Sequence, residues 1–152
     1  MGPAGPGMLT VVDANGVEVG TAIDPFGGTI ARKVGDDWVT FQTTSDGLTA
    51  SPINFFHTTP DCTGPRYFTT TGGVGFAYLA VVRGSWAFYT KVADPTFTHV
   101  DSIQSFESIA PDQDPLLPGT CVAWQGGMRS VGEVTATQDA ALGALVAPFR
   151  IR

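Results

Sequence analysis

The amino-acid sequence predicts an all-β fold, an antiparallel sandwich or barrel-like domain of about ten short strands. Its 152 residues include 19 Gly and 11 Pro but only two Lys and three Glu. Residues that form turns therefore outnumber those that favour exposed helix positions. Runs rich in Val, Thr and aromatic residues recur about every 8–12 residues, the strand spacing typical of a small β-domain.

The strands of the first half pair around clear turn signals. Residues 9–13 and 17–23 flank Asn15-Gly16, and Asn-Gly is the strongest short hairpin signal. Gly35-Asp36-Asp37 separates the next pair in the same way. The remaining predicted strands of this half are 29–33 and 38–43, 53–58 and 66–70, and 76–82 and 86–92. Continuous apolarity in 76–82 predicts that both of its faces are covered, by core and by a neighbouring subunit.

The second half predicts fewer and less regular strands. Residues 96–108 alternate weakly and indicate one or two strands, followed by a loop over 111–119. Two strands are predicted on either side of Gly126-Gly127, one helical turn follows, and a final strand closes the domain. Their ranges are 121–124 and 131–137, then 138–145, then 144–151.

Charge limits the classes of partner. Charged residues make up 14% of the chain, against about 25% in a typical soluble domain. So little charge predicts either a surface rich in Thr, Ser, Gln and Gly or a subunit interface. The net charge of −6 and the scattered Arg and Lys residues argue against nucleic-acid binding. No apolar run approaches the ~20 residues of a membrane-spanning helix, so membrane insertion is not expected.

Cys62 and Cys121 are the only two cysteines. Neither belongs to a Cys-x-x-Cys motif or a Cys/His cluster, so no metal site is expected. We expect them to pair as a disulfide, closing a 60-residue loop worth about 4 kcal/mol in chain entropy. The alternative is two free, half-buried thiols. A bridge would imply an oxidising compartment.

No residue pattern predicts a catalytic centre or a cofactor. His57 and His99 lie in predicted strands, and Ser85 lacks the second glycine of a nucleophile elbow. The few Glu residues leave little choice for a carboxylate pair, and the turn acids lack the spacing of a calcium loop. The acids concerned are Glu18, Glu107, Glu133, Asp36, Asp37, Asp112 and Asp114. The sequence thus favours a non-enzymatic protein, with a polysaccharide hydrolase as the alternative.

Aromatic side chains are the candidate binding residues. Trp38 follows a turn, Trp124 precedes Gly126-Gly127, and Tyr67 adjoins the loop that carries Cys62. Trp86 and Tyr78 fall in the apolar hairpin and are expected in the core. The faces of exposed aromatic rings pack on the apolar side of a sugar ring. Trp38, Trp124 and Tyr67 are therefore the residues predicted to contact a receptor or glycan, and the alternative is that they pack within the domain.

Several motifs together carry a resemblance. They are Gly-Pro-Ala-Gly-Pro-Gly at 2–7, Val-Val-Asp-Ala-Asn-Gly at 11–16, Ala-Arg-Lys-Val-Gly-Asp-Asp-Trp-Val at 31–39, Asp-Cys-Thr-Gly at 61–64 and Leu-Val-Ala-Pro-Phe-Arg-Ile at 145–151. The chain resembles the C-terminal globular β-domains that follow collagen-like stalks in bacterial surface and phage tail-fibre proteins. Because a collagen stalk has three chains, the resemblance implies a homotrimeric head.

The domain prediction is a collagen-like stub or linker at residues 1–8 and a single β-rich head at 9–152. The resemblance implies an extracellular location, on a cell surface or a virion, and no catalytic residues. The predicted function is adhesion or receptor binding at the end of a fibre. A purely structural cap for the stalk is the remaining alternative.

Overall fold

The computed structural model describes residues 9–24, 28–48, 53–69, 73–74, 77–91, 96–106 and 120–152. These residues form thirteen strands and one short helix, which confirms the all-β prediction. The chain divides into two compact units. Unit 1 comprises Met1–Thr49, Gly73–Ala87 and Thr137–Arg152, and unit 2 comprises Ala50–Gly72 and Phe88–Ala136. The predicted stub at 1–8 lies outside the described residues, and one domain over 9–152 stays a prediction.

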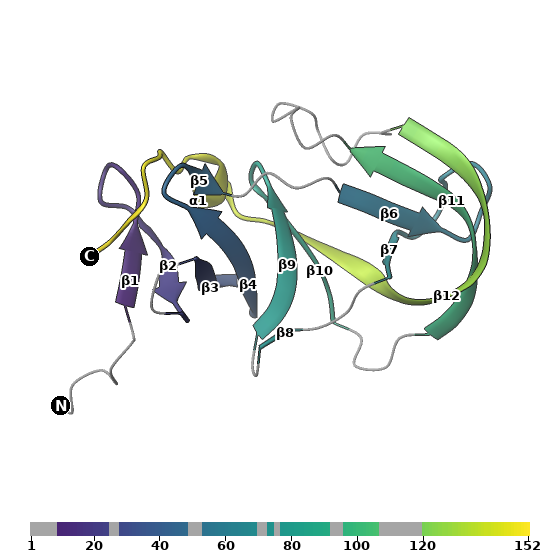
Figure 1. Ribbon diagram of the computed structural model, residues 1–152, viewed down its shortest axis with the longest axis horizontal. Helices are drawn as coiled ribbons and strands as arrows, with labels where there is room; N and C mark the ends of the chain where they lie inside the picture. Colours follow the sequence, from purple (N-terminus) through teal and green to yellow (C-terminus); the bar gives the residue numbers. More distant parts are fainter. Residues whose placement is uncertain are drawn as a thin grey trace. The chain divides into compact units, whose positions relative to one another are not determined.

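Unit 1 is built on a sheet in the order β9-β4-β3-β2-β1-β13 (Figure 1). Short β5 pairs with β4, and β8 with β9. The bounds are β1 Leu9–Val12, β2 Glu18–Ala22, β3 Thr29–Val34, β4 Asp37–Thr44, β5 Gly47–Leu48, β8 Gly73–Val74, β9 Ala77–Arg83 and β13 Arg150–Ile151. The β4–β9 pair is parallel, so the sheet is mixed rather than purely antiparallel.

The two predicted hairpins of unit 1 are confirmed. β1 pairs with β2 and β3 with β4, both antiparallel. Gly16 and Gly35 have φ of +81° and +56°, a backbone region that glycine enters without steric cost. A third tight turn at Gly84 joins β9 to β10 (Trp86–Thr90).

The C-terminal segment of unit 1 differs from the single strand predicted for 144–151. The helical turn is confirmed as α1 (Ala140–Gly143), with Asp139 as its N-cap. Only Arg150 and Ile151 then pair with β1. Pro148 has no N–H to give to a sheet ladder, and the neighbouring backbone makes other hydrogen bonds, such as Phe149 N to Ser45 O at 2.9 Å.

A buried carboxylate holds this segment against the first hairpin. Asp13 is 1% exposed. Its Oδ1 accepts the N–H groups of Asn15 and Val17, and its Oδ2 accepts that of Val146 at 3.0 Å. Arg150 Nη1 donates to the Asp13 carbonyl. The Val146 hydrogen bond, helped by those from Val17 and Asn15, lowers the pKa of Asp13 below 3.8 against the opposing effect of burial.

Unit 2 is a ring of four mutually paired strands. β6 (Ile53–His57) pairs with β11 (Thr96–Phe106) and with β7 (Tyr67–Phe68), and β12 (Thr120–Gln138) pairs with both β7 and β11. Figure 1 shows β12 bending around β11. Phe55 is fully buried inside, with its ring centroid 5.6 Å from that of Phe68 and 5.2 Å from that of Phe88.

The prediction of two strands around Gly126-Gly127 is wrong, because β12 runs through both glycines. Val100 lies opposite Gly127 and Ser102 opposite Ala123, so three residues of β12 face one of β11. This is a bulge, in which extra residues bend a strand without ending it. Gly127, with φ of +74°, takes up the bend where the sequence suggested a hairpin turn.

Thr40 offers a test of packing in unit 1. It is 1% exposed, and its Oγ1 has no hydrogen-bond partner among the described residues. Because a buried unpaired hydroxyl is unfavourable, Thr40→Val should raise the free energy of unfolding by about 1 kcal/mol, measured by urea denaturation. Thr40→Ser keeps the hydroxyl and should give no gain. A less stable Thr40→Val protein would contradict this reading.

Asp13 predicts a specific acid sensitivity. Because its pKa is lower in the folded chain, the stabilisation is complete above 3.8 and is lost as pH falls through the folded-state pKa. Asp13→Asn should be less stable than the wild type at neutral pH. Its melting temperature should fall less than that of the wild type between about pH 5 and pH 2.

Circular dichroism melts across this pH range make the comparison, with Asp46→Asn, in an exposed turn, as the matched control. Parallel pH curves for wild type and Asp13→Asn would refute the role assigned to Asp13.

Candidate functional site

Partly exposed apolar side chains line one face of unit 2. Phe56 lies opposite Tyr67 on one side and Ile103 on the other, and Ile103 lies opposite Val122. Side chains directly opposite each other in antiparallel strands point to the same side. The Phe56 and Trp124 rings are 5.5 Å apart between centroids, which adds Trp124. We call these five residues the aromatic face.

The aromatic face is accessible and has a polar border. Val122 is 53% exposed, and the other four side chains are half-buried. The guanidinium carbon of exposed Arg129 lies 4.7 Å from the Trp124 ring centroid, a cation–π arrangement. Asn54, two residues before Phe56, is exposed and accepts a hydrogen bond from Ser105 Oγ. Apolar surface beside hydrogen-bonding groups suits an amphipathic ligand.

The opposite side of the same strands is buried and includes several polar side chains. His57 Nδ1 lies 3.2 Å from the Thr63 carbonyl oxygen, and Nε2 lies 3.2 Å from Gln104 Oε1. Ser102 Oγ donates to the Thr59 carbonyl and accepts the Cys62 N–H. These contacts fasten the loop between β6 and β7 onto β11.

The Cys62–Cys121 disulfide is confirmed, with the Cα atoms 6.0 Å apart. It joins the same loop to the start of β12, three residues before Trp124. The loop that precedes Tyr67 and the strand that carries Trp124 are therefore covalently linked. Thr63 Oγ1 donates to Asp61 Oδ1 at 2.7 Å, which lowers the pKa of Asp61 and adds to the order of the loop.

The three predicted binding residues fall in different places. Tyr67 and Trp124 both flank Phe56 in unit 2. Trp38 belongs to unit 1, at the start of β4, and lines a depression there. Sequence reasoning missed Phe56 and Arg129. Alternation in Ile53–His57 was an available signal, because polar Asn54 and Phe56 share one face while Ile53, Phe55 and His57 share the other.

His57, His99 and Ser85, the residues considered for catalysis, lie apart from the aromatic face or contact other groups. Both ring nitrogens of buried His57 lie within hydrogen-bonding distance of the loop and Gln104 oxygens, whereas His99 Nδ1 lies 2.7 Å from Asp101 Oδ1 at the surface. The Ser85 carbonyl accepts the Asp139 N–H at 2.7 Å. Within the described ranges there is no group of three or more His, Cys, Asp or Glu residues suited to a metal ion. The absence of catalysis stays a prediction.

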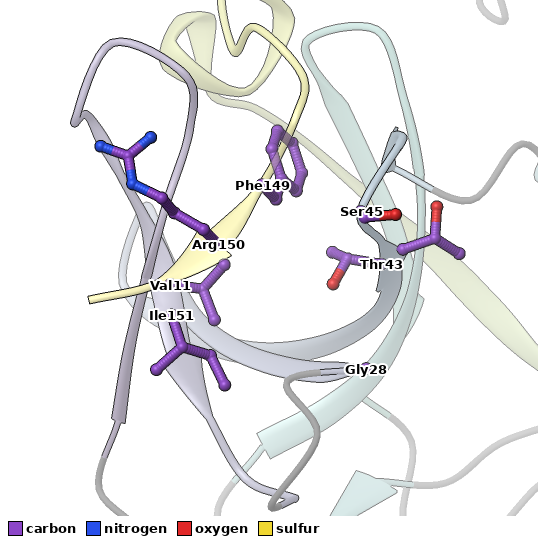
Figure 2. Close-up of a pocket in the computed structure, with 8 residues that line it drawn as sticks. Val11, Gly28, Thr43, Ser45, Phe149, Arg150 and Ile151 are labelled. Carbon is purple, nitrogen blue, oxygen red and sulfur yellow. The ribbon is translucent and has the colours of Figure 1, made fainter.

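A depression of about 290 Å³ marks where the C-terminal segment of unit 1 meets β1 and β4 (Figure 2). Val11, Thr43 and Phe149 on its walls are all buried. It is lined by Val11, Gly28, Thr43, Thr44, Ser45, Phe149, Arg150 and Ile151. Since its inner residues belong to the core, we interpret this depression as a packing seam.

Removing the disulfide should strongly destabilise the folded protein. The Cys62→Ser, Cys121→Ser double variant opens a loop with a sequence separation of 59. Chain entropy predicts a loss of about 4 kcal/mol in the free energy of unfolding, measured by urea denaturation under non-reducing conditions. The wild type treated with reductant serves as a second measurement. Equal stability of bridged and unbridged chains would contradict the expectation.

Across the part of the chain that the structure describes, no helix has the length and apolarity needed to cross a membrane. Comparison of the chain with protein-family models, with curated proteins and with solved structures found no match.

Proposed function

We propose that this chain is the non-enzymatic head of a trimeric fibre and binds a cell-surface glycan through the aromatic face of unit 2. The observation that carries the proposal is the position of Tyr67 and Trp124, far apart in sequence, on either side of Phe56. The sequence singled out both aromatic residues as candidate ligand contacts. Their convergence on one accessible face supports that role.

Glycan chemistry suits this face. A sugar ring has an apolar side of C–H groups that packs on aromatic rings, and hydroxyls at its edge that need hydrogen-bonding partners. Tyr67 and Trp124 supply the first kind of contact. Arg129, Asn54 and Glu133, which is exposed and lies opposite Tyr67, supply the second. The Cys62–Cys121 disulfide of the same unit is typical of proteins in oxidising, extracellular surroundings.

Low charge supports the trimer. With 14% charged residues, the chain has less charge than a typical monomer of this size. Three-fold association would cover part of the uncharged surface. The Gly-Pro repeats at residues 2–7 fit a three-stranded stalk.

Binding to a printed array of neutral and acidic oligosaccharides tests the glycan proposal. Trp124→Ala and Tyr67→Ala should each weaken the best signal about tenfold or more, because each removes a stacking surface. Phe97→Ala is the matched control: Phe97 is 67% exposed on β11, six residues from Ile103 and therefore about 20 Å along the strand. Equal binding by all three variants, or none by the wild type, would refute the proposal.

Light scattering in dilute solution tests the trimer separately. The expected mass is about 48 kDa, three times the 15.9 kDa of one chain. A mass of 15.9 kDa would refute trimerisation and leave the glycan proposal to be decided by the array.

A further inference from the structure

Trp38 borders a second surface, in unit 1. It lies at the start of β4, directly opposite Lys33 of β3, and is 40% exposed. The side chain lines an open depression of about 310 Å³, at the small end of the ~300–1,000 Å³ range of ligand sites. The lining residues are Glu18, Gly20, Thr21, Ala31, Arg32, Lys33 and Trp38.

The wall of this depression is held in place before any ligand binds. Arg32 Nε lies 3.0 Å from Asp139 Oδ2, and its Nη1 donates to the carbonyls of Glu18 and Val19 at 3.0 and 2.9 Å. One side chain thus joins β3, β2 and the N-cap of α1. A site whose groups are already ordered loses less conformational entropy on binding.

Gly20 sets how closely β2 and β3 approach. A Cβ there would lie 2.4 Å from Ile30 Cγ2 and 2.6 Å from the Ala31 carbonyl oxygen, so no other residue fits without a shift of the backbone. This close approach lets Arg32 reach the β2 carbonyls and keeps Thr21 opposite Ala31.

The charged side chains that line the depression balance one another once Asp139 is counted. Glu18 and Lys33 are exposed, and neither side chain forms a hydrogen bond or ion pair with another described residue. The Arg32 charge is compensated by Asp139. Among the described residues, the depression therefore offers the Glu18 carboxylate as an acceptor, the Lys33 ammonium as a donor and the Thr21 hydroxyl. Its lining side chains, counted together with Asp139, carry no net charge.

We infer that this depression binds a neutral pyranose, with the sugar ring against Trp38 and its hydroxyls toward Glu18, Lys33 and Thr21. An aromatic platform with both a donor and an acceptor matches a ring that is apolar on its face and carries hydroxyls at its edge. A site without net charge gives an acidic sugar no advantage over a neutral one. The inference rests on the proposed function in expecting glycan binding, and adds a separate contact in the other unit.

Tryptophan signals allow the test to be made site by site. The chain has three Trp residues, so the ¹H–¹⁵N spectrum contains three indole N–H signals, and Trp38→Phe identifies that of Trp38. Titration with millimolar galactose, glucose, mannose and N-acetylglucosamine should shift the Trp38 signal for at least one sugar. Glucuronic acid should bind no more tightly than glucose.

Variants then assign the contacts. Trp38→Ala should weaken binding of that sugar about tenfold or more, followed through the backbone signals of Thr21 and Lys33, and Trp38→Phe should retain part of it. Glu18→Gln should weaken it by a smaller factor, because an amide is a poorer acceptor than a carboxylate. Trp124→Ala is the matched control in the other unit and should leave the titration unchanged.

The outcomes separate the two proposals. If no sugar moves the Trp38 signal, or Trp38→Ala binds as the wild type does, the inference is overturned, whatever the array reports for Trp124. If glucuronic acid binds more tightly than every neutral sugar, the assignment to neutral sugars is overturned. Loss of sugar binding in Trp38→Ala, combined with unchanged array binding in Trp124→Ala, supports this inference and refutes the proposed role of the aromatic face.

Discussion

The buried carboxylate of Asp13 is the interaction on which unit 1 depends. The sheet ladder of its C-terminal segment is only two residues long, too short to hold the chain from Val146 to Ile151 in place. Asp13 compensates by accepting three backbone N–H groups, two from its own turn and one from Val146. A carboxylate that accepts several N–H groups is a strong acceptor, so one side chain fixes both a hairpin and the segment that packs beside it.

Unit 2 also has a segment without a sheet ladder, and it is held by side-chain hydrogen bonds and a disulfide. Its long loop between β6 and β7 has no ladder of its own, and it is held by the Ser102 hydroxyl, the His57 ring and the Cys62–Cys121 bridge. Tyr67 directly follows this loop in the sequence, and Trp124 lies three residues after Cys121 of the bridge. The positions of Tyr67 and Trp124 are therefore constrained by the buried His57 and Ser102 contacts and by the disulfide.

Sequence patterns predicted local features well and long-range ones poorly. Asn15-Gly16 was sufficient to predict the first hairpin, because the turn type leaves few alternatives. The cysteine pair favoured a disulfide but left two free thiols open, and the structure shows the bridge. Gly126-Gly127 was misread, because two glycines permit either a turn or a bulge, and only the pairing of β12 with β11 decides between them. The final strand was overpredicted for a similar reason: the backbone of residues 144–149 bonds to distant groups, such as Val146 N to Asp13 Oδ2 and Phe149 N to Ser45 O, that the sequence does not reveal.

For the candidate sites too, the sequence predicted the local features and not the long-range contacts. Composition and turn positions were enough to select Trp38, Trp124 and Tyr67 as surface aromatic residues. They could not indicate that Phe56 lies between two of them, because that depends on the β6–β7 and β6–β11 registers. They also could not indicate that Glu18 and Lys33 line the same depression. That depends on the close approach of β2 and β3 at Gly20.

The alternation of the chain between the two units has a consequence for its synthesis and dissection. The backbone passes from one unit to the other four times, and the last portion of unit 1 is Thr137–Arg152. During translation the Asp13 carboxylate therefore has no Val146 partner until residue 146 has been synthesised, and unit 1 cannot be completed earlier. For the same reason no single cut releases either unit as one continuous fragment, so either could be made alone only by joining segments in a new order.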